Sequence, residues 1–87
     1  MQTIDLDELG TLRDWVRWGA SQFRAEGLVF GHGSDNPLDE ALALVLHALH
    51  LDHDLPETFL DCQVTSQEAA QIVVLFERRI DDRVPVA

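Results

Sequence analysis

The stretch NPLDEALALVLHAL, residues 36–49, carries the strongest helix signal in this 87-residue sequence. Asn36 is a favourable N-cap, and Pro37 suits the first helical position because its missing N–H would have no partner there. Asp39 adds a carboxylate at the positive end of the helix. The apolar stripe consists of Leu38, Leu42, Val45, Leu46 and Leu49, and further apolar residues are Ala41, Ala43, Leu44 and Ala48. Because the segment is apolar on nearly every side, we expect it to be the central helix of the domain.

A second helix is predicted in TLRDWVRWGASQFRAEGL, residues 11–28. The hydroxyl of Thr11 can cap the first turn, and Asp14 occupies the reciprocal position of a capping box. At the other end Gly27 can adopt the left-handed conformation that ends a helix, with Leu28 placed for the accompanying apolar contact. One face of this helix carries Leu12, Trp15, Val16, Gly19 and Phe23.

Four large side chains lie away from that apolar face of the 11–28 helix. Trp18 falls well off the stripe, so we expect it to pack against something other than this helix's own core face, such as a neighbouring domain. Arg13, Arg17 and Arg24 form a basic stripe on another side. They either pair with neighbouring carboxylates or form a docking surface, and the sequence leaves both interpretations open.

A third helix is predicted in VTSQEAAQIVVLFERRIDDRVPVA, residues 64–87. Thr65 and Glu68 form a regular capping box, and Pro85 ends the helix by residue 84 at the latest. The apolar face consists of Ala69, Ile72, Val73, Phe76 and Ile80.

Two shorter elements complete the predicted fold. Pro56 can begin a helical turn near residues 56–61 that carries Phe59 and Leu60 inward, and a turn is expected at residues 5–9. No segment alternates apolar and polar residues over the length of a strand. We therefore predict an all-α fold, a small helical bundle of about four to five helices, in which residues 1–87 form a single domain.

The charge balance is strongly acidic, with 16 Asp and Glu against six basic residues, all of them Arg, for a net charge of −10. Such a chain is repelled by phosphate backbones, which argues against nucleic acid as a direct partner and favours a basic protein. Solubility alone also explains an acidic surface. The N-terminus has no leader pattern and no apolar stretch approaches about 18 residues, so we expect a cytoplasmic protein with no membrane contact.

Few residues could carry chemistry. His47, His50 and His53 invite a metal site, but His53 lies beyond the expected helix end and no further ligand is fixed by spacing, so a structural or surface role is favoured. Cys62, the only cysteine, has no neighbouring base or positive charge and is expected to be a small core residue rather than a nucleophile. The loop before Asn36 lacks a phosphate-binding arrangement and is not preceded by a strand.

Three stretches together resemble a known family. They are DWVRWGASQF at 14–23, GHGSDNPLDEALALVLHAL at 31–49 and TSQEAAQIVVLFERRIDDRVPVA at 65–87. The combination resembles the N-terminal helical domain of bacterial S-adenosylmethionine-dependent protein-glutamine methyltransferases. The ending Arg83-x-Pro85-x-Ala87 is shared across that superfamily. The GHGSDNPLDEA stretch is similar to the branch that methylates the third protein of the large ribosomal subunit.

This resemblance implies a substrate-recognition domain of a two-domain enzyme. The family's Rossmann-like catalytic domain, its S-adenosylmethionine site and its Asn-Pro-Pro-Tyr motif have no counterpart in these residues. We therefore expect no cofactor and no catalysis here, and expect the ribosomal protein and the catalytic domain as partners. The candidate residues for substrate or interdomain contact are Trp18, His32, Gly33, Asp35 and Asn36.

Two other interpretations remain open at this point. The chain is also compatible with an independent acidic helical module that binds a basic protein. The N-terminal part of an adenine-specific DNA methylase is a further alternative, because Asn-Pro-Pro-Tyr motifs occur in those enzymes as well, although the acidic charge disfavours it.

Overall fold

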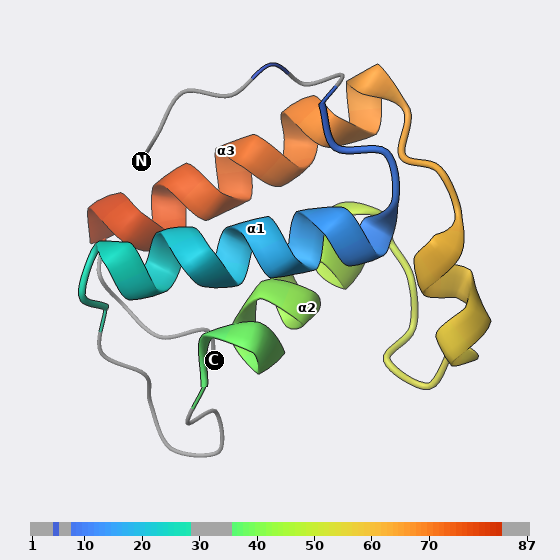
Figure 1. Cartoon of the computed structure of the whole chain (residues 1–87), viewed down its shortest axis with the longest axis horizontal. Coiled ribbons are helices and arrows are strands. Elements are labelled where there is room, and N and C mark those ends of the chain that lie inside the picture. Colours follow the sequence, from blue (N-terminus) through green and yellow to red (C-terminus); the bar gives the residue numbers. More distant parts are fainter. Residues whose placement is uncertain (1–4, 6–7, 29–35, 83–87) are drawn as a thin grey trace.

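The computed structural model describes residues 5, 8–28 and 36–82, and the remaining positions are not discussed structurally. Its elements are α1 (Leu12–Ala25), α2 (Pro37–Ala48), the 3₁₀ helix η1 (Glu57–Asp61) and α3 (Ser66–Asp82). Figure 1 shows α1 and α3 side by side, with α2 crossing behind α1 and η1 set to one side. The all-α prediction is confirmed, although the described ranges contain three α-helices, slightly fewer than the four to five helices predicted, together with one 3₁₀ helix.

The helix starts follow the predicted capping chemistry. The hydroxyl of Thr11 accepts the backbone N–H of Asp14 at 3.1 Å, and the Asp14 carboxylate accepts the Thr11 N–H at 3.2 Å. This backbone hydrogen bond from Thr11 is the main cause that lowers the pKa of Asp14, with smaller contributions from the Gly10 N–H and the Arg17 guanidinium. At α3, Thr65 and Glu68 form the same reciprocal pair, at 3.1 and 2.9 Å.

The ends of α1 and α2 share one motif but use different residues. After α1, Gly27 adopts φ +68°, and the Leu28 N–H donates to the carbonyl of Phe23 at 3.2 Å. After α2 the left-handed position is taken by His50 at φ +59°, and the Leu51 N–H donates to the Leu46 carbonyl at 2.9 Å. Both are Schellman motifs, and a non-glycine residue is unusual in this position.

Aromatic side chains fill the space between α1 and α3. The rings of Phe23 and Phe76 lie 5.3 Å apart, and the rings of Trp18 and Phe76 lie 6.2 Å apart. Gly19 permits this approach, because a Cβ atom there would lie 2.5 Å from the Phe76 ring. Trp18 was expected to pack away from this helix's own core face, for example against a neighbouring domain, but it belongs to the core of this fold: Trp18 is 6% exposed, lies against Phe76 of α3 and also contacts Trp15 edge to face. The apolar face of α1 is wider than one stripe because α1 packs against both other helices.

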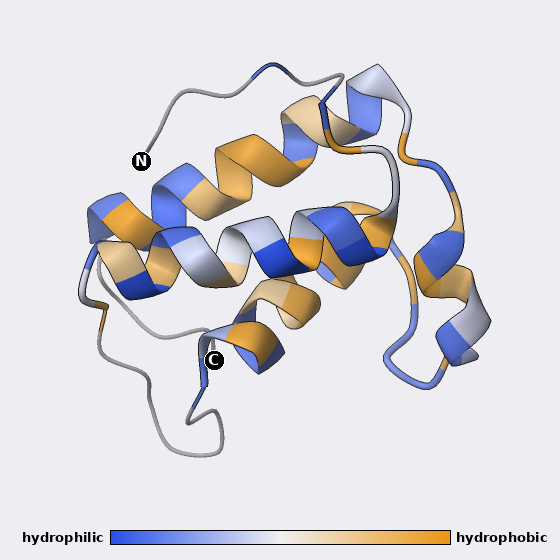
Figure 2. Ribbon diagram, in the orientation of Figure 1, coloured by the Kyte–Doolittle hydropathy of each residue, from blue (hydrophilic) through white to orange (hydrophobic). Residues whose placement is uncertain are grey.

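Three further burial predictions are wrong. Leu38 is 53% exposed and Phe59 is 46% exposed, although both were assigned inward positions. Cys62 is exposed as well, and its backbone rather than its thiol is used: its carbonyl accepts the Leu12 N–H at 3.2 Å and its N–H donates to the Phe59 carbonyl at 3.0 Å. Figure 2 shows why α2 was ambiguous: most of its ribbon is hydrophobic, so the hydropathy pattern alone does not indicate which side is buried. Among the described helices, none has the length and hydropathy that a membrane crossing requires.

Candidate interaction surface at the start of α2

The predicted contact residues do not form one cluster among the residues the structure describes. Asn36 is exposed at the start of α2, whereas Trp18 is buried between the helices. His32, Gly33 and Asp35 lie outside the described residues. Of the two predicted contact residues that the structure describes, Asn36 is therefore the exposed one. The packing of Trp18 between the helices leaves this side chain almost no surface area for contact with a partner.

Asn36 is fully occupied as a helix cap. Its side-chain oxygen accepts the Asp39 backbone N–H at 2.7 Å, and its side-chain nitrogen donates to the Asp39 carboxylate at 3.0 Å. Asn36 thus satisfies an otherwise unpaired backbone donor and also fixes the carboxylate at N3. These bonds explain the Asn36-Pro37 pair without any ligand.

One turn further along α2, Glu40 points into the protein and forms a buried ion pair that sequence analysis missed. Arg79 of α3 donates a hydrogen bond from Nε to Glu40 Oε1 and a second one from Nη2 to Oε2 at 3.4 Å. Both side chains are almost completely buried, at 1% and 2% exposed. A buried charge requires a partner of opposite sign, so this pair fixes α2 against α3.

A sequence signal for this pair does exist. Glu40 lies on the same helical face as Ala41, Leu44 and Ala48, and Arg79 continues the spacing of Phe76 on α3. A carboxylate and an arginine at buried positions of two different helices indicate an internal pair. We did not expect it because charged residues normally mark the solvent side.

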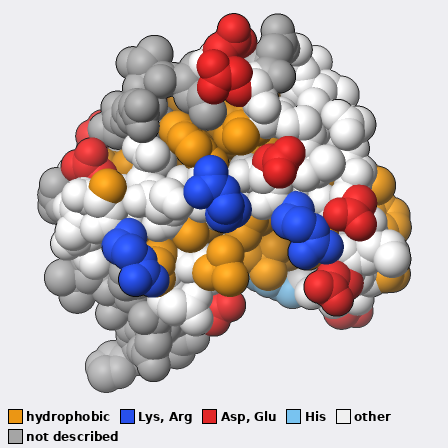
Figure 3. Space-filling view, viewed as in Figure 1, with side chains coloured by type: hydrophobic (Ala, Val, Ile, Leu, Met, Phe, Trp, Pro, Cys, Tyr) orange, Lys and Arg blue, Asp and Glu red, His pale blue; other side chains and the backbone are white. Residues whose placement is uncertain are grey.

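The opposite side of the first turn of α2 is open. A hollow of about 450 Å³ lies between α1 and the start of α2. It is lined by Arg17, Ala20, Ser21 and Arg24 of α1 and by Asn36, Pro37 and Leu38. We call this feature the α1–α2 groove. Figure 3 shows the basic side chains in a row across this face of the molecule, with hydrophobic atoms between and below them.

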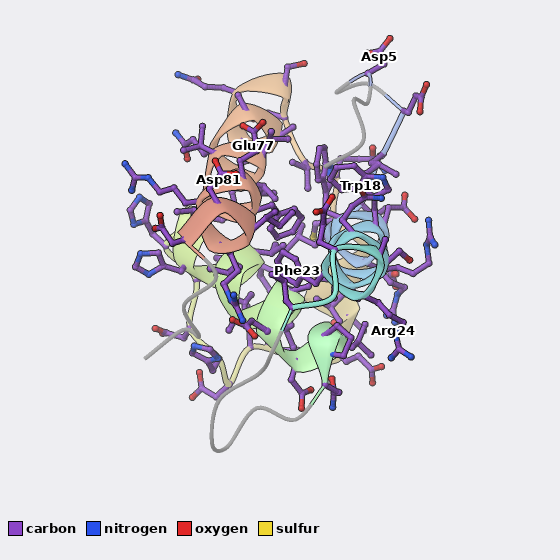
Figure 4. All side chains as sticks on the ribbon, turned by 90° about the vertical axis from the view of Figure 1, so that its left-hand side faces the viewer. Asp5, Trp18, Phe23, Arg24, Glu77 and Asp81 are labelled. Atoms are coloured by element: carbon purple, nitrogen blue, oxygen red, sulfur yellow. The ribbon has the colours of Figure 1, made fainter. Side chains whose placement is uncertain are left out.

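The three arginines of the predicted stripe have different surroundings. Arg13 pairs with Asp61 at 3.2 Å and lies 3.9 Å from Glu57, which ties α1 to η1. Arg17 donates to the Ser21 hydroxyl at 3.3 Å. In Figure 4, Arg24 points outward from α1, whereas Phe23 points between the helices. Within the described ranges no ion pair within 4 Å involves Arg17 or Arg24, although the Arg17 guanidinium contributes to the lowered pKa of Asp14 at longer range, so close local pairing accounts only for Arg13.

The three histidines do not converge. His47 and His50 line a hollow of about 290 Å³ beside Val74, whereas His53 lines a separate hollow of about 210 Å³. In the part of the chain that the structure describes, no three potential metal ligands lie together. The histidines therefore lie at the surface.

Comparison with known proteins gives close relatives over nearly all of the chain. It is 49% identical over 87 residues to the ribosomal protein uL3 glutamine methyltransferase of Xanthomonas campestris pv. campestris. Identity to the proteins of the same name is 52% over 81 residues in Xylella fastidiosa strain Temecula1 and 45% over 87 residues in Bordetella pertussis. The matches cover 93–100% of this chain. No protein-family model matches the chain, and no solved structure matches it significantly.

The helical fold and these matches together define the class that the chain resembles, the N-terminal helical domain of proteins named as methyltransferases. The particular proteins are the ribosomal protein uL3 glutamine methyltransferases, and the chain matches the N-terminal domain of that family. The chain spans 26–29% of the length of these relatives.

Proposed function

We propose that this chain is the substrate-recognition domain of an S-adenosylmethionine-dependent enzyme that methylates the side-chain amide of a glutamine in ribosomal protein uL3. The observation that carries the proposal is the identity of 45–52% over nearly the whole chain to methyltransferases of that name. Cofactor binding and methyl transfer then belong to the catalytic part of the enzyme. Its place of action is the cytoplasm, where ribosomal proteins are made.

A separate recognition domain suits this chemistry. An amide nitrogen is a weak nucleophile, so the glutamine must be held in line with the methyl group that is transferred. Contacts far from the reacting atoms can supply the binding free energy for this positioning. A domain that holds the body of the protein substrate would therefore raise the rate of methylation without touching the amide.

The charge of the domain supports a basic protein as the substrate. The net charge of −10 attracts a cationic partner over long range and repels nucleic acid. Because the acidic domain is repelled by nucleic acid, we expect it to bind the ribosomal protein before that protein is bound to ribosomal RNA. We expect the association rate to fall as the salt concentration rises.

Deletion of the domain tests this proposal. The full-length enzyme and a variant lacking the residues that correspond to 1–87 are compared for methylation of purified uL3, measured by mass spectrometry. We expect kcat/KM for uL3 to fall by roughly a hundredfold or more, as expected when substrate positioning is lost. The Kd for S-adenosylmethionine, measured by calorimetry, should not change. Unchanged methylation of uL3 by the deletion variant would overturn the proposal.

A further inference from the structure

The α1–α2 groove is basic in a strongly acidic domain. Of the six arginines of the chain, Arg79 is buried against Glu40 and Arg13 pairs with two carboxylates. Arg17 and Arg24 both line the groove, and no ion pair occupies either guanidinium among the residues described. Figure 3 shows this face with its basic side chains exposed.

The groove is also partly apolar. Leu38 is the most exposed of the large hydrophobic side chains in the described structure, at 53%, and it lines the groove together with Pro37 and Ala20. An exposed leucine in the same groove as two arginines fits a segment that carries carboxylates near an apolar residue. A basic substrate would meet two like charges here.

We infer that the α1–α2 groove docks an acidic segment of the enzyme's own catalytic part, and that uL3 is held elsewhere on the domain. The inference rests on the proposed function, because it takes the catalytic part of the relatives as the second partner. The relatives are more than three times as long as this chain.

The small size of the groove favours a partner in the same polypeptide. Each exposed ion pair strengthens binding by only roughly two- to fivefold, so two such pairs and one leucine give weak affinity between separate molecules. A segment of the same chain is present at an effective concentration of about 1 mM, which makes a weak contact sufficient. The two arginines also make the groove selective for acidic segments, because they repel basic ones.

Hydrogen exchange followed by mass spectrometry tests this assignment. The 87-residue domain is compared with the same residues in the full-length enzyme, without uL3. We expect backbone amides of residues 17–24 and 38–40 to exchange roughly tenfold more slowly in the full-length enzyme, because docking suppresses local opening. Glu77 and Asp81 point from α3 away from Arg24 in Figure 4, so residues 77–81 serve as the internal control and should not change.

Charge reversal assigns the effect to the groove. In the full-length enzyme Arg17→Glu together with Arg24→Glu should abolish the slower exchange, whereas Arg78→Glu, at an exposed position on α3, should leave it intact. Equal exchange in the free domain and the full-length enzyme would overturn the inference, and so would protection that develops only when uL3 is added. If the domain deletion leaves uL3 methylation unchanged while this protection is present, the proposed function fails and the docking inference stands.

Discussion

The two sides of the first turn of α2 show opposite uses of arginine. On the side facing α3, Arg79 and Glu40 are buried together and hold the two helices in place. On the side facing α1, Arg17, Arg24 and Leu38 line one groove at the surface. The NPLDE segment thus contributes one side chain to the core and another to the surface within three residues.

This difference separates stability from recognition. Removing one member of a buried pair leaves an uncompensated charge in the protein and lowers the free energy of unfolding. Replacing an exposed arginine changes this free energy little. The closed side should therefore control folding, and the open side should control binding at nearly constant stability. Four predictions test this division, ordered below by their expected effect on the free energy of unfolding.

Glu40→Ala should have the largest effect. It leaves the buried Arg79 charge without its carboxylate partner and should lower the free energy of unfolding by about 3–5 kcal/mol. A domain of this size has a total stability of about 5–10 kcal/mol, so this loss is a large fraction of the whole. Urea titration followed by circular dichroism measures the loss.

The matched control replaces both members of the pair. Glu40→Met combined with Arg79→Met should recover most of the lost stability, because a buried pair can be exchanged for apolar side chains of similar size. A single Glu40→Ala variant that loses less than about 1 kcal/mol would show that the pair does not hold α2 against α3.

Gly19→Ala should have the next largest effect, because it disturbs the close contact between α1 and α3. The added methyl group would lie 2.5 Å from the Phe76 ring, so the ring or the helix must move. Overpacking of this kind lowers the free energy of unfolding by about 1–3 kcal/mol. Thermal unfolding measures it, and Phe76→Leu in the same chain should relieve part of the loss. A wild-type midpoint in Gly19→Ala would show that the contact is loose.

Asn36→Ala acts at the junction between the two sides. It removes the acceptor for the Asp39 N–H and should lower the free energy of unfolding by about 1 kcal/mol. Asn36→Ser is the matched control, because serine also caps helices, and it should retain most of the stability. Equal losses in Ala and Ser variants would mean that Asn36 acts through something other than capping.

Arg17→Glu and Arg24→Glu should have the smallest effect on stability. Neither arginine forms an ion pair within the residues described, so each replacement should change the free energy of unfolding by less than about 0.5 kcal/mol. Urea titration of each variant beside Arg13→Glu checks this, since Arg13 does pair with Asp61 and should lose more. A larger loss at Arg24 than at Arg13 would assign Arg24 a role in the fold.

Much of the fold could be predicted because its signals are local. The capping residues Thr11, Asn36 and Thr65 and the left-handed Gly27 act within one helical turn, so the sequence around each of them was sufficient. The resemblance to the methyltransferase family could also be recognised from short sequence segments. It is confirmed by the relatives.

The errors concern contacts between elements that are distant in sequence. Trp18 is buried because Phe76, 58 positions later, packs against it, and Glu40 is buried because Arg79 supplies the opposite charge. In α2 the nearly uniform hydropathy does not indicate which side of the helix is buried, so Leu38 was wrongly predicted to face the core. Of the predicted contact residues, Asn36 is explained by its capping hydrogen bond. The groove beside Asn36 could not be predicted because it is lined by residues of two different helices, α1 and α2.

Direct titration of the 87-residue domain with uL3 tests the central claim, that this domain recognises the substrate. Isothermal calorimetry at low and physiological salt is compared with the same titration using cytochrome c, a basic protein that is not a substrate. We predict saturable binding of uL3 at least about tenfold tighter than that of cytochrome c, weakening as salt rises and not weakened by Arg17→Glu with Arg24→Glu, which make the domain more acidic. Binding of uL3 no tighter than that of cytochrome c would contradict the claim.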